Sequence, residues 1–140
     1  MTDHVNPSRD SFRAFREHPR AGPVQMLNLV RFRRQAIYED GRDASGAEAY
    51  AAYGRESGPI FRALGGRIVW SGRPEVMVIG PEADEAWDIA FIAEYPSVDA
   101  FVAMIRDPDY QKAAAHRTAG VENSRLIRME PLSPGAGFGE

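Results

Sequence analysis

The chain has no cysteine among its 140 residues, and this absence excludes several kinds of chemistry. Without thiols there are no disulfides, no thiolate zinc or iron–sulfur ligands and no cysteine nucleophile. The three histidines, His4, His18 and His116, do not have the spacing of a metal site. HExxH, phosphate-binding GxxxxGK(S/T) and GxSxG motifs are also missing, so hydrolase, kinase and dehydrogenase activities have no support. We expect neither a metal nor another cofactor.

The chain also has no long apolar run and no excess of basic charge. No stretch approaches the roughly 20 apolar residues of a membrane-spanning helix, and the N-terminal region lacks the apolar core of a signal peptide. Seventeen basic residues against twenty acidic ones give a net charge of −3. This balance lacks the electrostatic footprint of a nucleic-acid binder, with the RFRR cluster as the one local exception. We expect a soluble, cytoplasmic protein that binds neither nucleic acid nor membrane.

The length and the 44% hydrophobic content suit one domain with a sizeable core. Residues 1–22 are expected to form an N-terminal helical extension, because Phe12 and Phe15 stand three apart and Ser8 can cap a helix. Residues 23–131 are expected to be the folded domain. The proline- and glycine-rich residues 132–140 are expected to form a flexible tail.

Alternating and short apolar segments predict a sheet. Residues 24–32, 67–72, 75–80, 87–95 and 124–130 are predicted to be strands. Residues 44–64 have helical spacing, and Gly58-Pro59 should kink this helix or divide it in two. Ser97 and Asp107 can each cap a helix before the last strand. The order predicts an α+β domain whose antiparallel sheet has one apolar face without helices, and a homodimer would cover that face.

Four segments carry a family resemblance. From Pro23 to about Glu130, MLNLVRF, GGRIVWSG, EYPSVDAFVAM and DPDYQKAAAHR resemble the DUF1330 family of small uncharacterised proteins, within the dimeric α/β-barrel superfamily. The resemblance is strongest in the last two segments. It implies a ferredoxin-like βαββαβ protomer whose antiparallel sheet joins that of a second copy in a dimeric α/β barrel. It implies no reaction, because a fold alone does not assign one.

The superfamily also contains heme-degrading monooxygenases, cofactor-independent quinol monooxygenases, muconolactone isomerases and sensory domains. Its heme-degrading members use an asparagine on the first strand, a tryptophan at the end of the third and a histidine on the following helix. Asn28 falls near the first position, whereas Tyr95 and Ala114 take the other two. His116 lies two residues further, about 200° round the helix from the ligand position. These departures from the heme-degrading pattern make heme binding the less favoured alternative.

Two polar residues of the first strand are candidate ligand contacts. Asn28 places a carboxamide inside the apolar MLNLV run, where it needs a hydrogen-bond partner. That partner is either a structural one, in a neighbouring strand or water, or a ligand in an apolar pocket. Arg31 faces the opposite side of an extended strand, where it either pairs with a carboxylate or binds an anionic ligand.

The remaining candidates are aromatic or lie at the end of the last helix. An imidazole can act as a general base near neutral pH, but His116 occupies a solvent-facing helical position that favours a structural role. Arg117 shares the apolar face of that helix and could contact a ligand or an interface. Tyr53, Trp70 and Tyr95 offer amphipathic surface for the core, for a dimer contact or for stacking on an aromatic ligand.

Together these features predict a small cytoplasmic homodimer that binds a small aromatic or carboxylated metabolite. The candidate ligand-binding residues are Asn28, Arg31, Tyr53, Trp70, Tyr95, His116 and Arg117. A cofactor-independent monooxygenase or isomerase is one hypothesis, because a shaped apolar cavity with one or two polar anchors can orient a substrate. A non-catalytic ligand-sensing or dimerisation module is the alternative, and the sequence does not decide between them.

Overall fold

The computed structural model describes residues 3–138, and within this range it has one antiparallel sheet and five helices. The strands are β1 (Val24–Phe32), β2 (Arg67–Gly72), β3 (Ile89–Tyr95) and β4 (Val121–Met129). The helices are α1 (Arg9–Glu17), α2 (Gly46–Ala63), α3 (Glu82–Glu85), α4 (Val98–Arg106) and α5 (Pro108–Gly120). The strand order is β2-β3-β1-β4. Apart from α1 and the short α3, and with α4 and α5 together in the place of the second helix, this is a ferredoxin-like βαββαβ arrangement, so the predicted α+β fold is confirmed.

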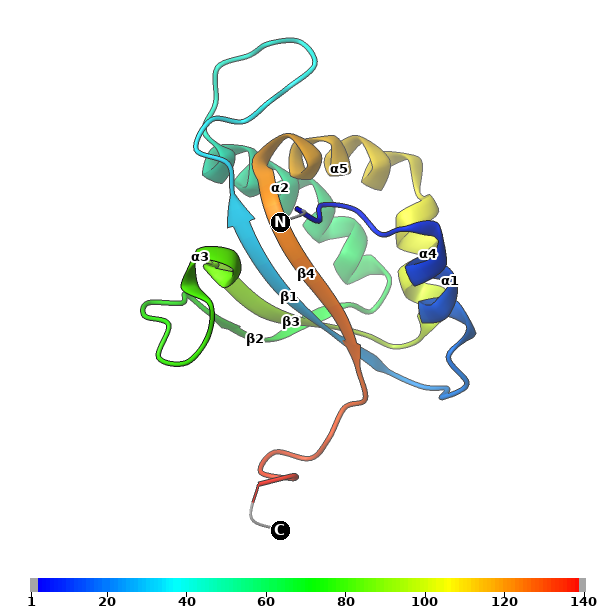
Figure 1. Ribbon diagram of the computed structural model, residues 1–140. Coiled ribbons are helices and arrows are strands. Elements are labelled where there is room, and N and C mark those ends of the chain that lie inside the picture. The colour runs from blue at the N-terminus through cyan, green and yellow to red at the C-terminus, as the bar shows by residue number, and fades with distance from the viewer. Residues whose placement is uncertain (1–2, 139–140) are drawn as a thin grey trace.

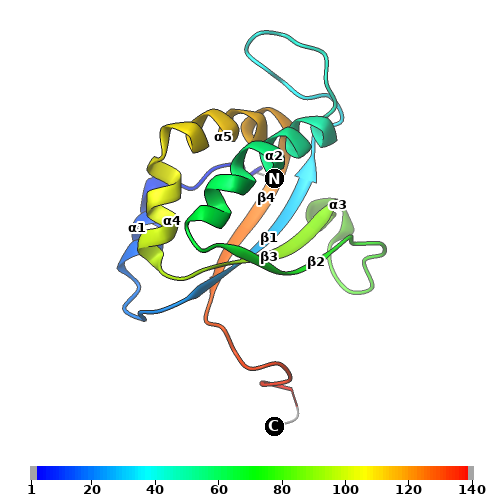
Figure 2. The ribbon, with the colours of Figure 1, turned by 180° about the vertical axis from the view of Figure 1, so that it is seen from behind.

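The molecule has two layers. Figures 1 and 2 show α2, α4 and α5 over one face of the curved sheet, with α1 beside α4. We call the helix-covered side the inner face, and there Asn28 lies opposite Phe91 and Leu126. On the other side, the outer face, Leu27 lies opposite Ile92 and Ile127. Among the helices of residues 3–138, the short α3 lies against one end of the outer face, where it contacts Arg31 and Arg125, and the rest of this face has no helical layer (Figure 1).

The helices begin where the sequence supplies caps. Ser45 and Glu48 form a capping box at the start of α2, with reciprocal hydrogen bonds of 3.0 and 2.8 Å. Ser97 caps α4, and Asp107 caps α5. The carboxylate of Asp107 accepts from two backbone N–H groups at that helix start. Each cap satisfies backbone donors that have no partner within the helix itself.

Helix α2 is not divided at Pro59, so of the two predicted outcomes, a kink or a division into two helices, the division is wrong. The helix runs without interruption from Gly46 to Ala63. A proline inside a helix removes one donor, but α2 packs along α5 and buries part of Ile60 and Phe61 against the core. This packing holds the helical path through residue 59. Close approach of the two helices also depends on Gly120, because an added Cβ would lie 2.7 Å from the Gly46 carbonyl oxygen.

Residues 75–80 form a loop between β2 and α3, so the prediction of a strand there is wrong. The apolar Val78 and Ile79 are 87% and 91% exposed. Pro74 has no backbone N–H for a strand ladder, and Gly80, with a φ of 144°, lies at the end of the loop before α3. The third strand also begins two residues later than predicted, at Ile89, and the last begins three residues earlier, at Val121.

The main core lies between the inner face and the helices. It is formed by Val24, Met26, Ala93, Tyr95, Phe101, Met104 and Tyr110. Phe15 of α1 packs edge-on against Phe101 at 4.9 Å between ring centroids, although α1 itself buries no residue. Among the helices described, none is long and apolar enough to cross a membrane.

Candidate functional site

A large cavity separates the inner face from the helices. Its volume is about 1670 Å³, and α2, α4, α5 and all four strands contribute to its walls. The N-terminal segment, residues 4–20, contributes another wall. The aromatic residues that line the cavity are Phe12, Phe15, Tyr50, Tyr53, Phe61, Phe91, Tyr95, Phe101 and Tyr110. Such concave, largely aromatic surfaces are typical of small-molecule sites.

The charged residues around the cavity are almost all cationic. Its described lining contains seven arginines and one acidic residue, Glu130. Five of the arginines are Arg9, Arg20, Arg62, Arg117 and Arg128. The other two, Arg67 and Arg125, border the cavity from outer-face positions, where they pair with Glu94 and Glu85. A wall with this composition favours an anion over a cation or a neutral ligand.

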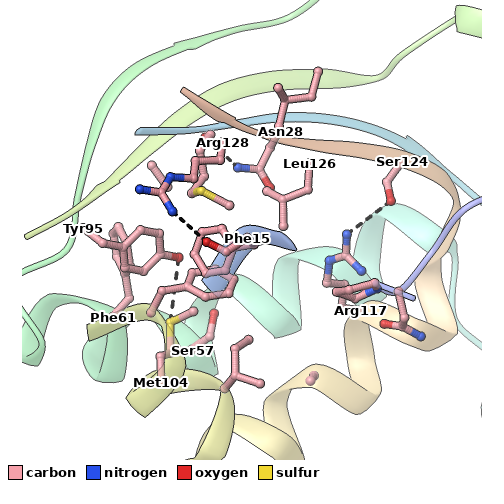
Figure 3. Close-up of a pocket in the computed structure, with 18 of the residues that line it drawn as sticks. Phe15, Asn28, Ser57, Phe61, Tyr95, Met104, Arg117, Ser124, Leu126 and Arg128 are labelled. Atoms are coloured by element: carbon pink, nitrogen blue, oxygen red, sulfur yellow. Dashed lines mark hydrogen bonds between the residues drawn. The ribbon is translucent and has the colours of Figure 1, made fainter. Parts of the chain in front are cut away.

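Arg117 reaches the cavity from the last turn of α5. One of its terminal nitrogens donates to the Val5 carbonyl at 2.5 Å, and the other donates to Ser124 Oγ at 3.3 Å (Figure 3). No carboxylate of the described residues lies within ion-pair distance of this guanidinium. Among the described residues, its hydrogen-bond acceptors are therefore neutral oxygen atoms only.

Arg128 projects from β4 into another part of the cavity (Figure 3). Its terminal nitrogens donate to the carbonyls of Phe15 and Arg20 at 2.6 and 2.8 Å, and its guanidinium lies 5.5 Å from the Phe15 ring centroid. Burial, and secondarily the nearby Arg20, lower the pKa of Arg128 from its ordinary value. Within residues 3–138 this guanidinium also has no carboxylate partner.

Asn28 lies on the inner face in the middle of β1. Its side-chain nitrogen donates to the Met26 carbonyl at 3.0 Å (Figure 3). The amide nitrogen must be the atom that faces this carbonyl, because two oxygen atoms in that position would repel each other. The amide oxygen of Asn28 accepts no hydrogen bond from the residues described. It is an available acceptor on the cavity wall.

Four tyrosines lie together beside these polar groups. The hydroxyls of Tyr53 and Tyr110 are 2.8 Å apart, and the Tyr95 hydroxyl donates to Met104 Sδ at 3.9 Å. Burial raises the pKa of Tyr50, Tyr95 and Tyr110 well above the ordinary value for a phenol. These three phenols are therefore neutral near pH 7. They can exchange hydrogen bonds with a ligand but cannot take a proton from it.

Arg31 and Trp70 lie away from the cavity. Arg31 Nε is 2.8 Å from Glu122 Oε2, and its guanidinium lies over the Trp87 ring at 5.9 Å. The ladder between β2 and β3 shifts register between Ile68 and Trp70. This irregularity places Trp70 opposite Ile92 on the outer face, where it is 52% exposed.

His116 also lies outside the cavity. Its Nδ1 is 2.6 Å from the Tyr38 hydroxyl, and its Nε2 is 2.8 Å from Glu56 Oε2. The imidazole thus links the loop of residues 33–45 to α2 and α5. Ala114, two residues earlier, is the residue that faces the cavity.

Of the seven candidate residues, the cavity brings together Asn28, Tyr53, Tyr95 and Arg117. Arg128 and the N-terminal segment also line the cavity, although neither was among the candidates predicted from the sequence. The sequence did contain a signal for Arg128: it lies two residues after Leu126 in β4, and residues two apart in a strand share a face. The sequence contains no comparable signal that residues 4–20 lie beside a strand more than 100 positions later.

Comparison with known proteins places the chain among proteins of unknown function. The model of the DUF1330 family, a domain of unknown function, matches residues 42–130. The crystal structure of the methylated RPA0582 protein is similar at 61% identity, over 96% of this chain and 99% of that chain, with a TM-score of 0.91. Another structure of RPA0582, a protein of unknown function from Rhodopseudomonas palustris, has 59% identity over 95% and 100% of the two chains, with a TM-score of 0.90.

More distant structures share the fold alone. A dabb family protein with a ferredoxin-like fold from Mesorhizobium loti is 16% identical, over 80% of this chain and 99% of that chain, with a TM-score of 0.52. No curated protein matches the chain. The family match and the full-length similarity to RPA0582 agree with the resemblance found in the sequence, and the chain belongs to the DUF1330 family.

Proposed function

We propose that this protein is a cytoplasmic homodimer that binds a small aromatic carboxylate in the cavity under its helices. One observation carries the proposal: Arg117 extends into an aromatic-lined cavity without a carboxylate partner among residues 3–138. A partly buried charge is costly to keep without a counter-charge. A ligand carboxylate would supply it and would form short, charge-assisted hydrogen bonds to the guanidinium.

The other cavity residues suit the rest of such a ligand. The amide oxygen of Asn28 would accept a hydrogen bond from a hydroxyl or N–H group of the ligand. Rings such as those of Tyr53 and Phe91 would pack against its aromatic part. These contacts fix orientation, whereas the apolar walls supply most of the favourable burial.

The outer face supports the dimer part of the proposal. Trp70 and Ile127 are 52% and 47% exposed there, and Leu27 and Ile92 lie beside them in the register. An apolar sheet face without a helical layer is usually covered by a partner. A second copy of the chain presents the same apolar surface and would bury both faces at once.

Native mass spectrometry of gently purified protein tests both parts. We expect the mass of a dimer, with a retained small molecule or with added benzoate, cinnamate or 4-hydroxycinnamate bound. A monomer at micromolar concentration would contradict the dimer. Protein that retains no molecule and takes up none of these three acids would contradict the ligand.

Two finer versions of this function differ in what happens to the bound molecule. In a cofactor-independent monooxygenase or isomerase, the ligand changes mass or structure during aerobic incubation. In a ligand-sensing module it is released unchanged. Mass and NMR spectra of the ligand before and after incubation distinguish the two.

A further inference from the structure

Two of the arginines that line the cavity, Arg117 and Arg128, occupy separate positions in it. The Arg117 guanidinium is hydrogen-bonded to Ser124, and Arg128 lies four residues further along the same face of β4. Four residues of extended strand span roughly 13 Å between the two backbone positions. Figure 3 shows the two side chains at different places along the cavity.

The surface between these two arginines is apolar with a single carboxamide. Leu126 stands between Ser124 and Arg128 on the inner face, and the register places Asn28 directly opposite it. Phe91 is the other neighbour of Asn28 across the sheet. The inner face therefore offers a cation, an apolar middle with one polar contact, and a second cation.

Both guanidinium groups keep donors for a ligand. A guanidinium has five N–H groups. Arg117 and Arg128 each use two of them, one on each terminal nitrogen, for the hydrogen bonds to protein oxygens described above. The acceptors of those bonds are neutral carbonyl and hydroxyl oxygens, so neither charge is neutralised by a residue that the structure describes. Each position is able to bind a carboxylate.

From this arrangement we infer that the natural ligand carries two anionic groups, one at each end of an apolar or aromatic middle. Arg117 binds one anionic group and Arg128 binds the other, while Asn28 contacts the middle. This rests on the proposed function, because it specifies the ligand class of the same cavity. A separation of roughly 10 Å between the anionic groups fits the strand spacing, since both arginine side chains extend into the cavity.

A matched pair of probes tests the inference by isothermal titration calorimetry. Cinnamate and 4-carboxycinnamate share the ring and the acrylate group and differ in the second carboxylate. We expect 4-carboxycinnamate to bind the full-length protein at least tenfold more tightly than cinnamate. Equal affinities would overturn the inference and leave the proposed function standing. No binding of either probe would overturn both.

Variants of Arg128 test its role in the affinity for the second carboxylate independently. Arg128→Gln should reduce the affinity for 4-carboxycinnamate to that for cinnamate, and should change the cinnamate affinity less than threefold. Arg128→Lys keeps the charge, so it should retain part of the preference and shows whether a loss in Arg128→Gln comes from misfolding. A tenfold preference for the dianion that persists in folded Arg128→Gln would contradict the role of Arg128.

Discussion

Arginines on the two sides of the sheet have different partners. On the outer face each arginine contacts a carboxylate at 2.7–2.9 Å, and the pairs are Arg31–Glu122, Arg67–Glu94 and Arg125–Glu85. On the inner side, Arg117 and Arg128 contact only carbonyl and hydroxyl oxygens among the described residues. Arginine thus has carboxylate partners on the outer face and neutral oxygen partners on the inner side.

This difference separates residues that bind from residues that support the fold. Partly exposed ion pairs typically contribute only about 0–1 kcal/mol to stability, so the loss of one outer-face arginine should change little. An arginine without a counter-ion still offers strong, charge-assisted hydrogen bonds to an anion. The outer face is accordingly suited to a flat protein contact and the inner face to a small anion.

The largest expected effect comes from placing a charge on the outer face. Ile127→Asp should weaken the proposed homodimer at least a hundredfold, because a carboxylate would be buried without a partner in the apolar interface that we propose. Analytical ultracentrifugation measures the change in association. Ile37→Asp is the matched control, since Ile37 is exposed in the loop of residues 33–45 and should leave association unchanged. A dimer of normal strength in Ile127→Asp would show that this face is not the interface.

The next effect compares one arginine from each face. Arg117→Gln should weaken cinnamate binding about tenfold to a hundredfold, as expected for roughly 1.5–3 kcal/mol from a charged hydrogen bond. Arg31→Gln removes the same charge from the outer face and should leave the affinity unchanged. Calorimetry at constant ionic strength measures both. Similar losses in the two variants would mean that only the overall charge matters, and the distinction between the faces would disappear.

A smaller effect is expected for the two carboxamides of β1. Asn28→Ala should weaken binding of 4-hydroxycinnamate about twofold to tenfold, since a neutral hydrogen bond contributes roughly 0.5–1.5 kcal/mol. Gln25→Ala is the outer-face control, because its side chain donates to Glu94 at 3.0 Å. Affinity measured by calorimetry should change only in Asn28→Ala. An unchanged affinity in that variant would remove Asn28 from the site.

The sequence predicted the face of the sheet on which a side chain lies for some strands and not for others. In β1 the period of two placed Asn28 and Arg31 on opposite sides, and the structure has them there. In β2 the same reasoning could not place Trp70, because the register shift after Ile68 depends on pairing with β3. The α+β fold and the family followed from motifs of the chain itself, whereas the cavity depends on tertiary packing. Its N-terminal wall comes from residues distant in sequence from the strands that it covers.

The smallest expected effect on ligand binding comes from His116, which lies on neither face of the sheet. His116→Gln should lower the free energy of unfolding by about 1 kcal/mol, because the links to Tyr38 and Glu56 are weakened. Chemical denaturation measures this loss, and calorimetry should find an unchanged affinity for cinnamate. Tyr38→Phe removes the same hydrogen bond from the other side and should have a similar effect on stability. A His116→Gln variant of normal stability but weaker cinnamate binding would instead bring the imidazole back into the candidate site.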